Sequence, residues 1–321
     1  MMIRLLGVLF LTLAWPTAYA QSDAYPGKLV RIVVPFPGGG TADAVTRIVA
    51  EKLSASWGQP VIIDNRPGAG GNIGAEQFSR AEPDGYTLMS SPPGPIAVND
   101  SLHKGLRYDP TKFVPISLLA TSVSVLVVRP DLKVDSVKDL VKLAKESPRK
   151  LSFASQGNGS TSHLTAAMFQ QQAGVEMLHV PYKSSPAALT DVMGGQIDVF
   201  FDNISSSIAQ HRAGKIRILA VASPSRTPAL PELPTISEAA LAGFQSVSWN
   251  ALVGPAGLPA PIAQKISAAV AEALRLPDVR DRYAKLSADP VGSTPEEAAR
   301  FITDERARWK KVIQDANVSV D

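Results

Sequence analysis

A glycine-rich turn between an apolar run and a helical pattern is the feature that most constrains how this chain can fold. Residues 29–34 form a short apolar run rich in β-branched side chains, which predicts a buried strand. Gly38-Gly39-Gly40 then frees the backbone for a tight turn, and residues 42–57 predict a helix that Thr41 or Asp43 could cap. The first amides of a helix have no intrahelical partner and lie at the positive end of its dipole. The turn therefore predicts an anion site made of main chain.

The same glycines exclude two common phosphate-binding motifs. A Walker loop needs Gly-Lys-Ser/Thr after its glycines, and no lysine follows Gly40. The dinucleotide fingerprint needs G-x-G-x-x-G, which three consecutive glycines do not supply. A tight turn without any ligand stays open as an alternative, since glycine turns are common in α/β folds.

The first twenty residues predict a signal peptide that is cleaved on export. Arg4 supplies positive charge, residues 5–15 form the apolar core, and Ala18-Tyr19-Ala20 is an A-x-A cleavage site. The apolar run is too short for a stable membrane span. The sequence contains no cysteine, so it forms no disulfide, which favours a bacterial periplasm. We expect a periplasmic protein that begins at Gln21.

The charge and histidine content excludes several kinds of partner and site. The formal net charge is only +3, and the basic residues are scattered rather than gathered with aromatic ones, so we expect no nucleic-acid partner. The four histidines form neither an HxH nor an H-E-x-x-H pattern, so we expect no metal site. We also expect no cofactor.

Two further glycine-rich turns repeat the design of the first. Residues 65–74 follow an apolar run at 61–64, and residues 155–163 follow one at 151–154. Strands that alternate with helices at this spacing predict an α/β fold with parallel-rich sheets covered on both faces. Ligands of such sheets bind outside the carboxyl ends of the strands, so two domains that both present these ends would enclose a cleft.

The division into domains follows from a pair of apolar runs in the middle of the chain. Ala120-Thr121-Ser122 split residues 114–119 from residues 123–128, and we interpret the second run as a strand that crosses into another domain. The expected division is residues 1–20 as signal peptide, residues 21–122 and 224–321 as a discontinuous first domain, and residues 123–223 as the second domain.

A hydrolase is the alternative that the side chains leave open. Ser160 and His163 lie three residues apart on one helix face and could touch, but there is no G-x-S-x-G elbow, and a triad needs a buried acid. Asp202, which follows an apolar strand, is the best candidate acid and could equally cap the next helix. We favour a structural role for His163 over a ligand contact. No activated base is apparent, so we expect no catalytic residues and no enzyme activity.

The sequence resembles the Bug proteins, also called TctC-like proteins, of tripartite tricarboxylate transporters. The matching motifs run in order over essentially the whole mature chain. They are Pro35-Phe36-Pro37-Gly38-Gly39-Gly40-Thr41-Ala42-Asp43, Asn65-Arg66-Pro67-Gly68-Ala69-Gly70-Gly71, Asp84-Gly85-Tyr86-Thr87-Leu88, Gly157-Asn158-Gly159-Ser160-Thr161-Ser162-His163-Leu164, Val180-Pro181-Tyr182-Lys183, Gly194-Gly195-Gln196-Ile197-Asp198, Leu219-Ala220-Val221 and Leu233-Pro234-Thr235.

The resemblance implies a two-domain periplasmic binding protein of type II, an α/β fold with mixed, parallel-rich sheets flanked by helices and a ligand cleft between the domains. It implies a monomer that captures a small carboxylate and delivers it to the permease subunits of the transporter, or a ligand-sensing receptor without transport. The carboxylate would be held largely by main chain and bridging waters. The expected ligand-binding residues are Phe36, Gly39, Gly40, Thr41, Ala42, Asp43, Ser90 and Ser91 of the first domain, and Ser155, Asn158, Gly159, Ser160, Thr161, His163, Lys183, Asp202 and Asn203 of the second.

Overall fold

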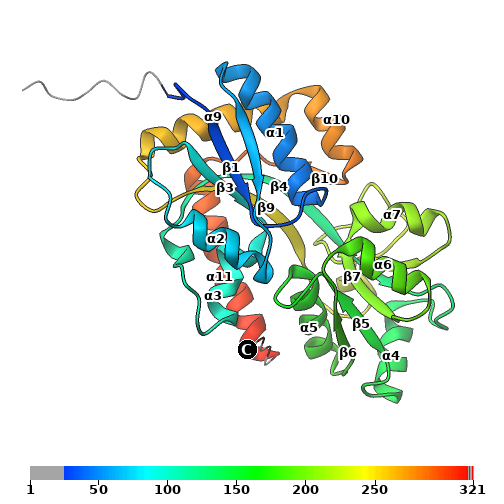
Figure 1. Cartoon of the computed structure of the whole chain (residues 1–321). Helices are drawn as coiled ribbons and strands as arrows, with labels where there is room; N and C mark the ends of the chain where they lie inside the picture. The colour runs from blue at the N-terminus through cyan, green and yellow to red at the C-terminus, as the bar shows by residue number, and fades with distance from the viewer. Residues whose placement is uncertain (1–24, 317, 319, 321) are drawn as a thin grey trace, which may run out of the picture.

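The structure, a computed structural model, describes residues 25–316, 318 and 320 of the chain (Figure 1). The predicted signal peptide and its cleavage site lie outside the described residues. The described strands form one mixed sheet in the order β2-β1-β3-β9-β4-β7-β5-β6, and β8 and β10 also pair with β4. Figure 1 shows this sheet as two halves that are each flanked by helices. The predicted α/β class with two domains is confirmed.

The first half contains a parallel core that continues into antiparallel strands. β1 pairs in parallel with β2 and β3, and β3 pairs antiparallel with β9. The strands are β1 (Val30–Val34), β2 (Val61–Asn65), β3 (Thr87–Ser91), β9 (Val247–Gly254) and β10 (Ala288–Pro290). The helices are α1 (Thr41–Trp57), α2 (Asn72–Phe78), α3 (Asn99–Leu102), α9 (Ala260–Arg275), α10 (Pro277–Lys285) and α11 (Pro295–Asp315), with the short helices η1 (Ala69–Gly71), η2 (Gly94–Val98) and η3 (Pro110–Lys112).

The second half repeats this arrangement. β5 pairs in parallel with β6 and β7, whereas β7 and β8 pair antiparallel with β4. The strands are β5 (Ser152–Ser155), β6 (Leu178–Pro181), β7 (Val199–Asn203) and β8 (Arg217–Val221). The helices are α4 (Val137–Glu146), α5 (Thr161–Ala173), α6 (Ser185–Met193), α7 (Ile204–Arg212) and α8 (Ile236–Ala239).

Alternate residues of the strands supply the cores on the two faces of the sheet. Ile32 packs in a cluster with Val45 of α1 and Ile266 of α9, while its neighbour Val33 belongs to the cluster on the opposite face with Phe78 of α2. This period of two is the pattern of a strand that is covered on both sides. Burial of each such side chain stabilises the fold by about 1.5–3 kcal/mol. The cores therefore fix the carboxyl ends of the strands, from which the glycine turns leave.

One long strand joins the two halves. β4 (Val114–Val128) pairs with β9 along its first part, down to the pair Val123–Val247, and with β7 from Ser124 onward. The predicted break at residues 120–122 is wrong. Thr121 and Ser122 continue the ladder because they pair with Trp249 and Ser248 of β9, and threonine fits a pleated, half-buried surface well.

The segment after β8 packs in the second half. Leu230 belongs to a hydrophobic cluster with Phe200 of β7, and Ile236 and Phe244 belong to one with Phe201. The predicted boundary at residue 223 stays a prediction. On this packing we propose that the second domain extends to about residue 246 and that β9 carries the chain back.

Candidate functional site

The first glycine turn leads from β1 into α1 without a side-chain cap. Gly39 has a φ of +87°, a left-handed conformation that favours glycine. Gly40 is extended and forms the N-cap, and no side-chain hydrogen bond caps the helix, which begins at Thr41. The predicted cap from Thr41 or Asp43 is therefore wrong. The first amides of α1 keep their capacity to bind an anion, next to the exposed residues Gly38 to Gly40.

The Asp43 carboxylate does not cap the helix because it braces the turn. Its Oδ2 accepts hydrogen bonds at 2.9 Å from the Gly39 amide and from Arg47 Nε, and its Oδ1 accepts one at 3.0 Å from Asn65 Nδ2. Burial acts to raise the pKa of Asp43, but the hydrogen bonds from Arg47, Gly39 and Asn65 outweigh it and the pKa is lowered. Asp43 is 3 % exposed, so a buried, ionised carboxylate holds the turn in shape.

Phe36 and the second glycine turn support the first turn from the side. Gly71 has a φ of +91°, and a Cβ placed on it would lie 3.2 Å from the Phe36 ring and 2.6 Å from Pro95 Cγ. Only glycine allows this close approach. Phe36 is half-buried against this contact.

Ser90 and Ser91 are fully buried at the end of β3. Ser90 Oγ lies 2.7 Å from Thr46 Oγ1 of α1 and accepts a hydrogen bond at 2.6 Å from Asn250 Nδ2 of β9. Ser91 Oγ donates to the Pro92 carbonyl at 3.0 Å. The hydroxyl of Ser90 thus ties α1 to the sheet beneath the first turn.

The second-half turn, residues 155–160, leads from β5 into α5 and is capped by its own side chain. Ser160 is the N-cap, and its Oγ accepts from the His163 amide at 3.3 Å and donates to the Gly157 carbonyl at 2.7 Å. Gly157 and Gly159 both have positive φ. Asn158 is exposed at the tip, and Thr161 is the first residue of α5.

The contacts of Ser160 and His163 do not form a nucleophile and base pair. Ser160 Oγ meets the His163 main chain, while the His163 Nδ1 atom accepts from the Gly159 amide at 3.2 Å. A hydrolytic triad needs the imidazole on the hydroxyl and the acid on the imidazole. Asp202 bonds neither group, so the geometry does not favour the hydrolase alternative.

Asp202 instead connects three segments of the second half. Its carboxylate accepts hydrogen bonds of 2.7–2.8 Å from Gln156 Nε2 in the turn, Ser185 Oγ at the start of α6, and Ser207 Oγ of α7. It is 1 % exposed, and this burial raises the pKa of Asp202 to about 6, although the hydrogen bonds act against the shift. Asn203, not Asp202, is the N-cap of α7, and it forms no side-chain cap there.

Lys183 lies exposed in the segment between β6 and α6. β6 stands at the end of the sheet order. The lysine lies two residues before Ser185, which donates to Asp202, so it borders the group of segments that this carboxylate holds together.

Contacts between the halves bring the two turns to one junction. Thr41 Oγ1 of α1 lies 3.4 Å from Ser205 Oγ of α7. A Cβ on Gly159 would lie 2.7 Å from Leu102 of α3. Behind them, Leu102 and Leu164 share a buried cluster with Trp309 of α11. The amino-terminal ends of α1, α5 and α7 therefore meet where the two halves face each other.

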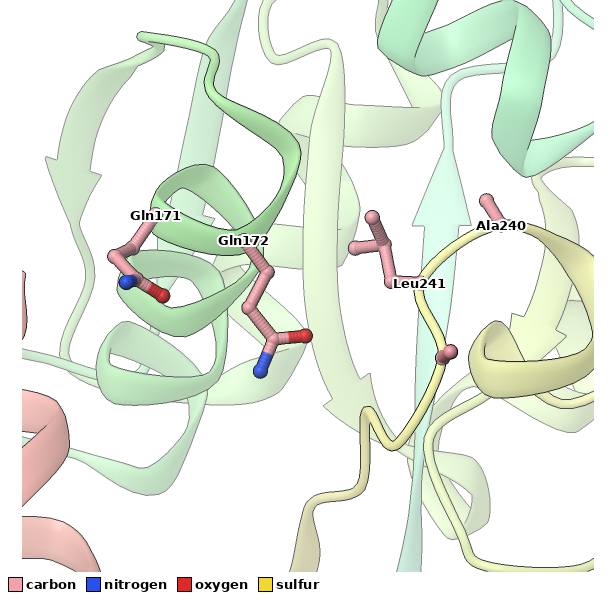
Figure 2. A pocket seen from close by; sticks show the side chains of 5 residues that line it. Gln171, Gln172, Ala240 and Leu241 are labelled. Atoms are coloured by element: carbon pink, nitrogen blue, oxygen red, sulfur yellow. The ribbon is translucent and has the colours of Figure 1, made fainter.

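Two surface hollows lie elsewhere. One, of about 440 Å³, is lined by Gln171, Gln172 and residues 240–242 (Figure 2). It adjoins the carboxyl end of α5, opposite the end that carries the second-half turn. The other, of about 380 Å³, lies between α3 and α11 beside Asp100 and Arg306. Neither includes a residue of the glycine turns.

Within residues 25–316, 318 and 320, no group of three or more His, Asp or Glu side chains could hold a metal ion. No helix in that part of the chain is long and apolar enough to cross a membrane.

Two α/β halves joined by crossing strands, with helix amino termini at their junction, define a solute-binding protein of the two-domain class. Three solved structures share the fold. Rpa4515 of R. palustris with adipate has a TM-score of 0.86 at 37 % identity and covers 92 % of this chain and 99 % of that one. MatC (Rpa3494) from Rhodopseudomonas palustris with bound malate has a TM-score of 0.82 at 33 % identity, covering 90 % and 100 %. The periplasmic binding protein BugD has a TM-score of 0.82 at 33 % identity, covering 92 % and 99 %.

The sequence comparisons identify the family. A family model described as the tripartite tricarboxylate transporter family receptor, TctC, matches residues 45–318. Protein BugT of Bordetella pertussis is 35 % identical over 323 residues, which cover 99 % of each chain. The chain belongs to the TctC family of solute-binding receptors, and the resemblance to the Bug proteins is confirmed.

Several residues of the junction escaped the sequence analysis. Asn65 and Arg47 share the Asp43 carboxylate, Gln156 binds Asp202, and His179 contacts Ser155. Two of them carried a usable signal. Arg47 lies four residues after Asp43 on one helix face, and Asn65 ends a strand parallel to β1, so both strand ends reach the same edge.

Proposed function

We propose that this protein binds a small organic acid as its anion between the two halves and delivers it to the permease of a tripartite tricarboxylate-type transporter. Its membership of the receptor family supports delivery to a permease. The adipate and malate complexes of Rpa4515 and MatC support a carboxylate as the ligand. The periplasmic placement of BugD, together with the A-x-A motif at Ala20, supports export to the periplasm.

The uncapped start of α1 is the single observation that carries the proposal. Asp43 and Arg47 form an ion pair that leaves no net charge to repel an anion, and Asp43 fixes Gly39 from behind. The amides that follow Gly40 point outward with the helix dipole behind them, which suits a carboxylate. A hydrogen bond to a charged group contributes roughly 1.5–3 kcal/mol.

We assign two kinds of role to the predicted site residues. Direct contact is proposed for the main chain of residues 40–42 and for the exposed or half-buried polar groups Thr41, Asn158, Thr161 and Asn203. The remaining residues support these groups, and they are Phe36, Gly39, Asp43, Ser90, Ser91, Ser155, Gly159, Ser160, His163 and Asp202. Lys183 would contact only a ligand that carries a second acidic group. We propose a monomer without a cofactor.

The substitution Gly40→Val tests the anion site. Gly40 has an ordinary extended conformation and nothing lies within 4 Å of a Cβ placed on it, so valine enters only the space of the ligand. Losing one or two amide contacts should weaken adipate or malate binding by about one to three orders of magnitude. Gly105→Val is the matched control, because its Cβ also meets nothing within 4 Å.

Calorimetry with both acids measures the difference, and circular dichroism checks folding. If folded Gly40→Val binds as tightly as Gly105→Val, the anion is not held at this turn. Recovery of the acid unchanged after incubation separates binding from hydrolysis. Loss of uptake in a deletion strain separates transport from sensing.

A further inference from the structure

Two histidine rings are stacked behind the second-half turn. His163 of α5 and His179 of β6 have ring centroids 4.0 Å apart and planes inclined by only 7°. Phe153 of β5 stacks on His179 at 4.8 Å. The topology explains this arrangement, because β5 and β6 are parallel neighbours in which Phe153 pairs with His179, and α5 leaves the end of β5. His163 is 8 % exposed.

Each ring holds a different part of the turn. His163 Nδ1 accepts from the Gly159 amide at 3.2 Å, and His179 Nε2 lies 2.6 Å from Ser155 Oγ. Ser155 Oγ also accepts from the Gly157 amide at 3.2 Å. A protonated Nδ1 cannot accept a hydrogen bond, so the Gly159 contact requires a neutral His163. The Gly159 contact therefore depends on an uncharged His163, whereas His179 Nε2 can either donate to Ser155 Oγ or accept from it.

The surroundings keep both rings neutral. Burial lowers the pKa of His163 and of His179 to about 4, and the neighbouring His179 ring lowers that of His163 further. α5, β5 and β6 carry no other titratable side chain. The charged groups on or beside the elements that face them include Asp100, Lys183, Asp191, Asp198, Asp202, Glu305 and Arg308, and none of these is among the causes of either shift.

We propose that His163 and His179 are positioning residues for the ligand, and that protonation of the stacked pair releases the bound organic anion. The inference rests on the proposed function, since it assigns a control to the same site. A proton on His163 Nδ1 removes the acceptor for the Gly159 amide, and a charge on either ring repels a second charge across 4.0 Å. The turn then loses the shape in which it faces α1.

Substitutions that keep the acceptors but cannot ionise test this inference. His163→Asn places an amide oxygen near the former Nδ1, and His179→Gln places an amide near the former Nε2. His211→Asn is the matched control, because His211 Nδ1 likewise accepts a main-chain amide, that of Ile218 at 3.2 Å, but belongs to α7. Adipate and malate serve as probes, and calorimetry from pH 7.5 to about 3, one unit below the pKa of about 4, gives their affinities.

Wild type should lose at least about tenfold more affinity than the double variant over this range, because release is linked to proton uptake. Protonation of the acids themselves is common to all variants and cancels in the ratio. His211→Asn should follow wild type. At pH 7.5, His179→Ala should weaken binding and His179→Gln should restore it. A double variant whose affinity falls in parallel with that of wild type overturns the inference.

A measurement without ligand separates this inference from the proposed function. In ¹⁵N-labelled protein, the Gly159 amide resonance should titrate together with the His163 and His179 rings, and should not titrate in the double variant. If the Gly159 amide resonance does not shift as the rings titrate, the positioning role is wrong. If neither acid binds at any pH, the proposed function fails for this ligand class, while the Gly159 titration still decides whether the histidines position the turn.

Discussion

Thr41 and Ser205 lie 164 residues apart in the sequence, yet their hydroxyl oxygens are 3.4 Å apart across the junction of the two halves. Thr41 is the first residue of α1, and Ser205 lies in the first turn of α7. A ligand that binds both helix ends favours the arrangement in which they meet, and so shifts the population toward it.

This contact predicts a small energetic coupling between the two hydroxyl groups. A neutral hydrogen bond contributes about 0.5–1.5 kcal/mol, and the long distance places this one at the lower end, so Ser205→Ala should weaken adipate binding about two- to threefold. Thr41→Ala should weaken it at least as much, because the Thr41 hydroxyl is also proposed to contact the ligand. The double variant should bind no more weakly than Thr41→Ala alone. A double-mutant cycle by calorimetry measures this, and strictly additive losses would show that the two groups do not interact.

Asp43→Ala should weaken ligand binding strongly, because the Gly39 amide and the Arg47 guanidinium lose the carboxylate that holds the turn in shape. We expect a loss of about 10- to 100-fold, equivalent to one or two hydrogen bonds of a charged group. Asp64→Ala removes ion pairs with Arg31 and Arg66 outside the turn and should leave affinity unchanged. Equal affinities of the two variants would contradict a positioning role for Asp43.

The same carboxylate predicts a pH dependence of stability. The pKa of Asp43 is lowered in the folded protein, so its contribution is present above the unfolded pKa and is lost as the pH falls through the folded one. Wild type should therefore approach Asp43→Ala in free energy of unfolding at acid pH. Urea titrations at several pH values measure the convergence.

Asp202 predicts the opposite dependence. The pKa of Asp202 is about 6 in the folded protein and 3.8 ordinarily. Between these values the folded state binds the proton more tightly than the unfolded state does, so the free energy of unfolding falls as the pH rises from about 4 to 6. The penalty above pH 6 has an upper limit of roughly 3 kcal/mol, at 1.36 kcal/mol per pH unit. Asp202→Asn removes this slope, although it also loses hydrogen bonds from Ser185 and Ser207. The free energy of unfolding is measured for both proteins at several pH values. An equal change with pH between pH 4 and 6 in the two proteins would refute the prediction.

Gly71→Ala should destabilise the protein more than Gly174→Ala. Both glycines have positive φ, which costs an alanine about 1–2 kcal/mol. A Cβ on Gly174 meets nothing within 4 Å, whereas one on Gly71 meets Pro95 at 2.6 Å and Phe36 at 3.2 Å, which should add about 1–3 kcal/mol. Thermal unfolding compares the two, and a Gly71→Ala protein as stable as Gly174→Ala would show that the loop can move aside.

Local patterns predicted the elements around the site well. The run at residues 29–34, the three glycines and the helical pattern at 42–57 correspond to β1, the first turn and α1 (Thr41–Trp57). These features depend on neighbours in sequence. The absence of a side-chain cap depends on residues that are distant in sequence. Asp43 accepts a hydrogen bond from Asn65, and Asn65 reaches Asp43 only because β1 pairs with β2.

Contacts between residues that are distant in sequence also explain why a break was predicted within β4. Thr121 and Ser122 interrupt an apolar pattern, and only their pairing with β9 shows that the ladder continues through them. His179 likewise carries no sequence signal for its role, since its contact with Ser155 requires β6 to lie beside β5. Long-range pairing, rather than local propensity, decides these positions.

The path of β4 and β9 has a consequence for the order of folding. β3 is an edge strand until β9 (Val247–Gly254) pairs with it, so the first half stays incomplete while the whole second half is being made. Pairings between such distant segments form slowly, because the intervening loop must first be closed. The second half, whose strands lie between these two segments, can fold as a unit before the first half closes around its amino-terminal strands.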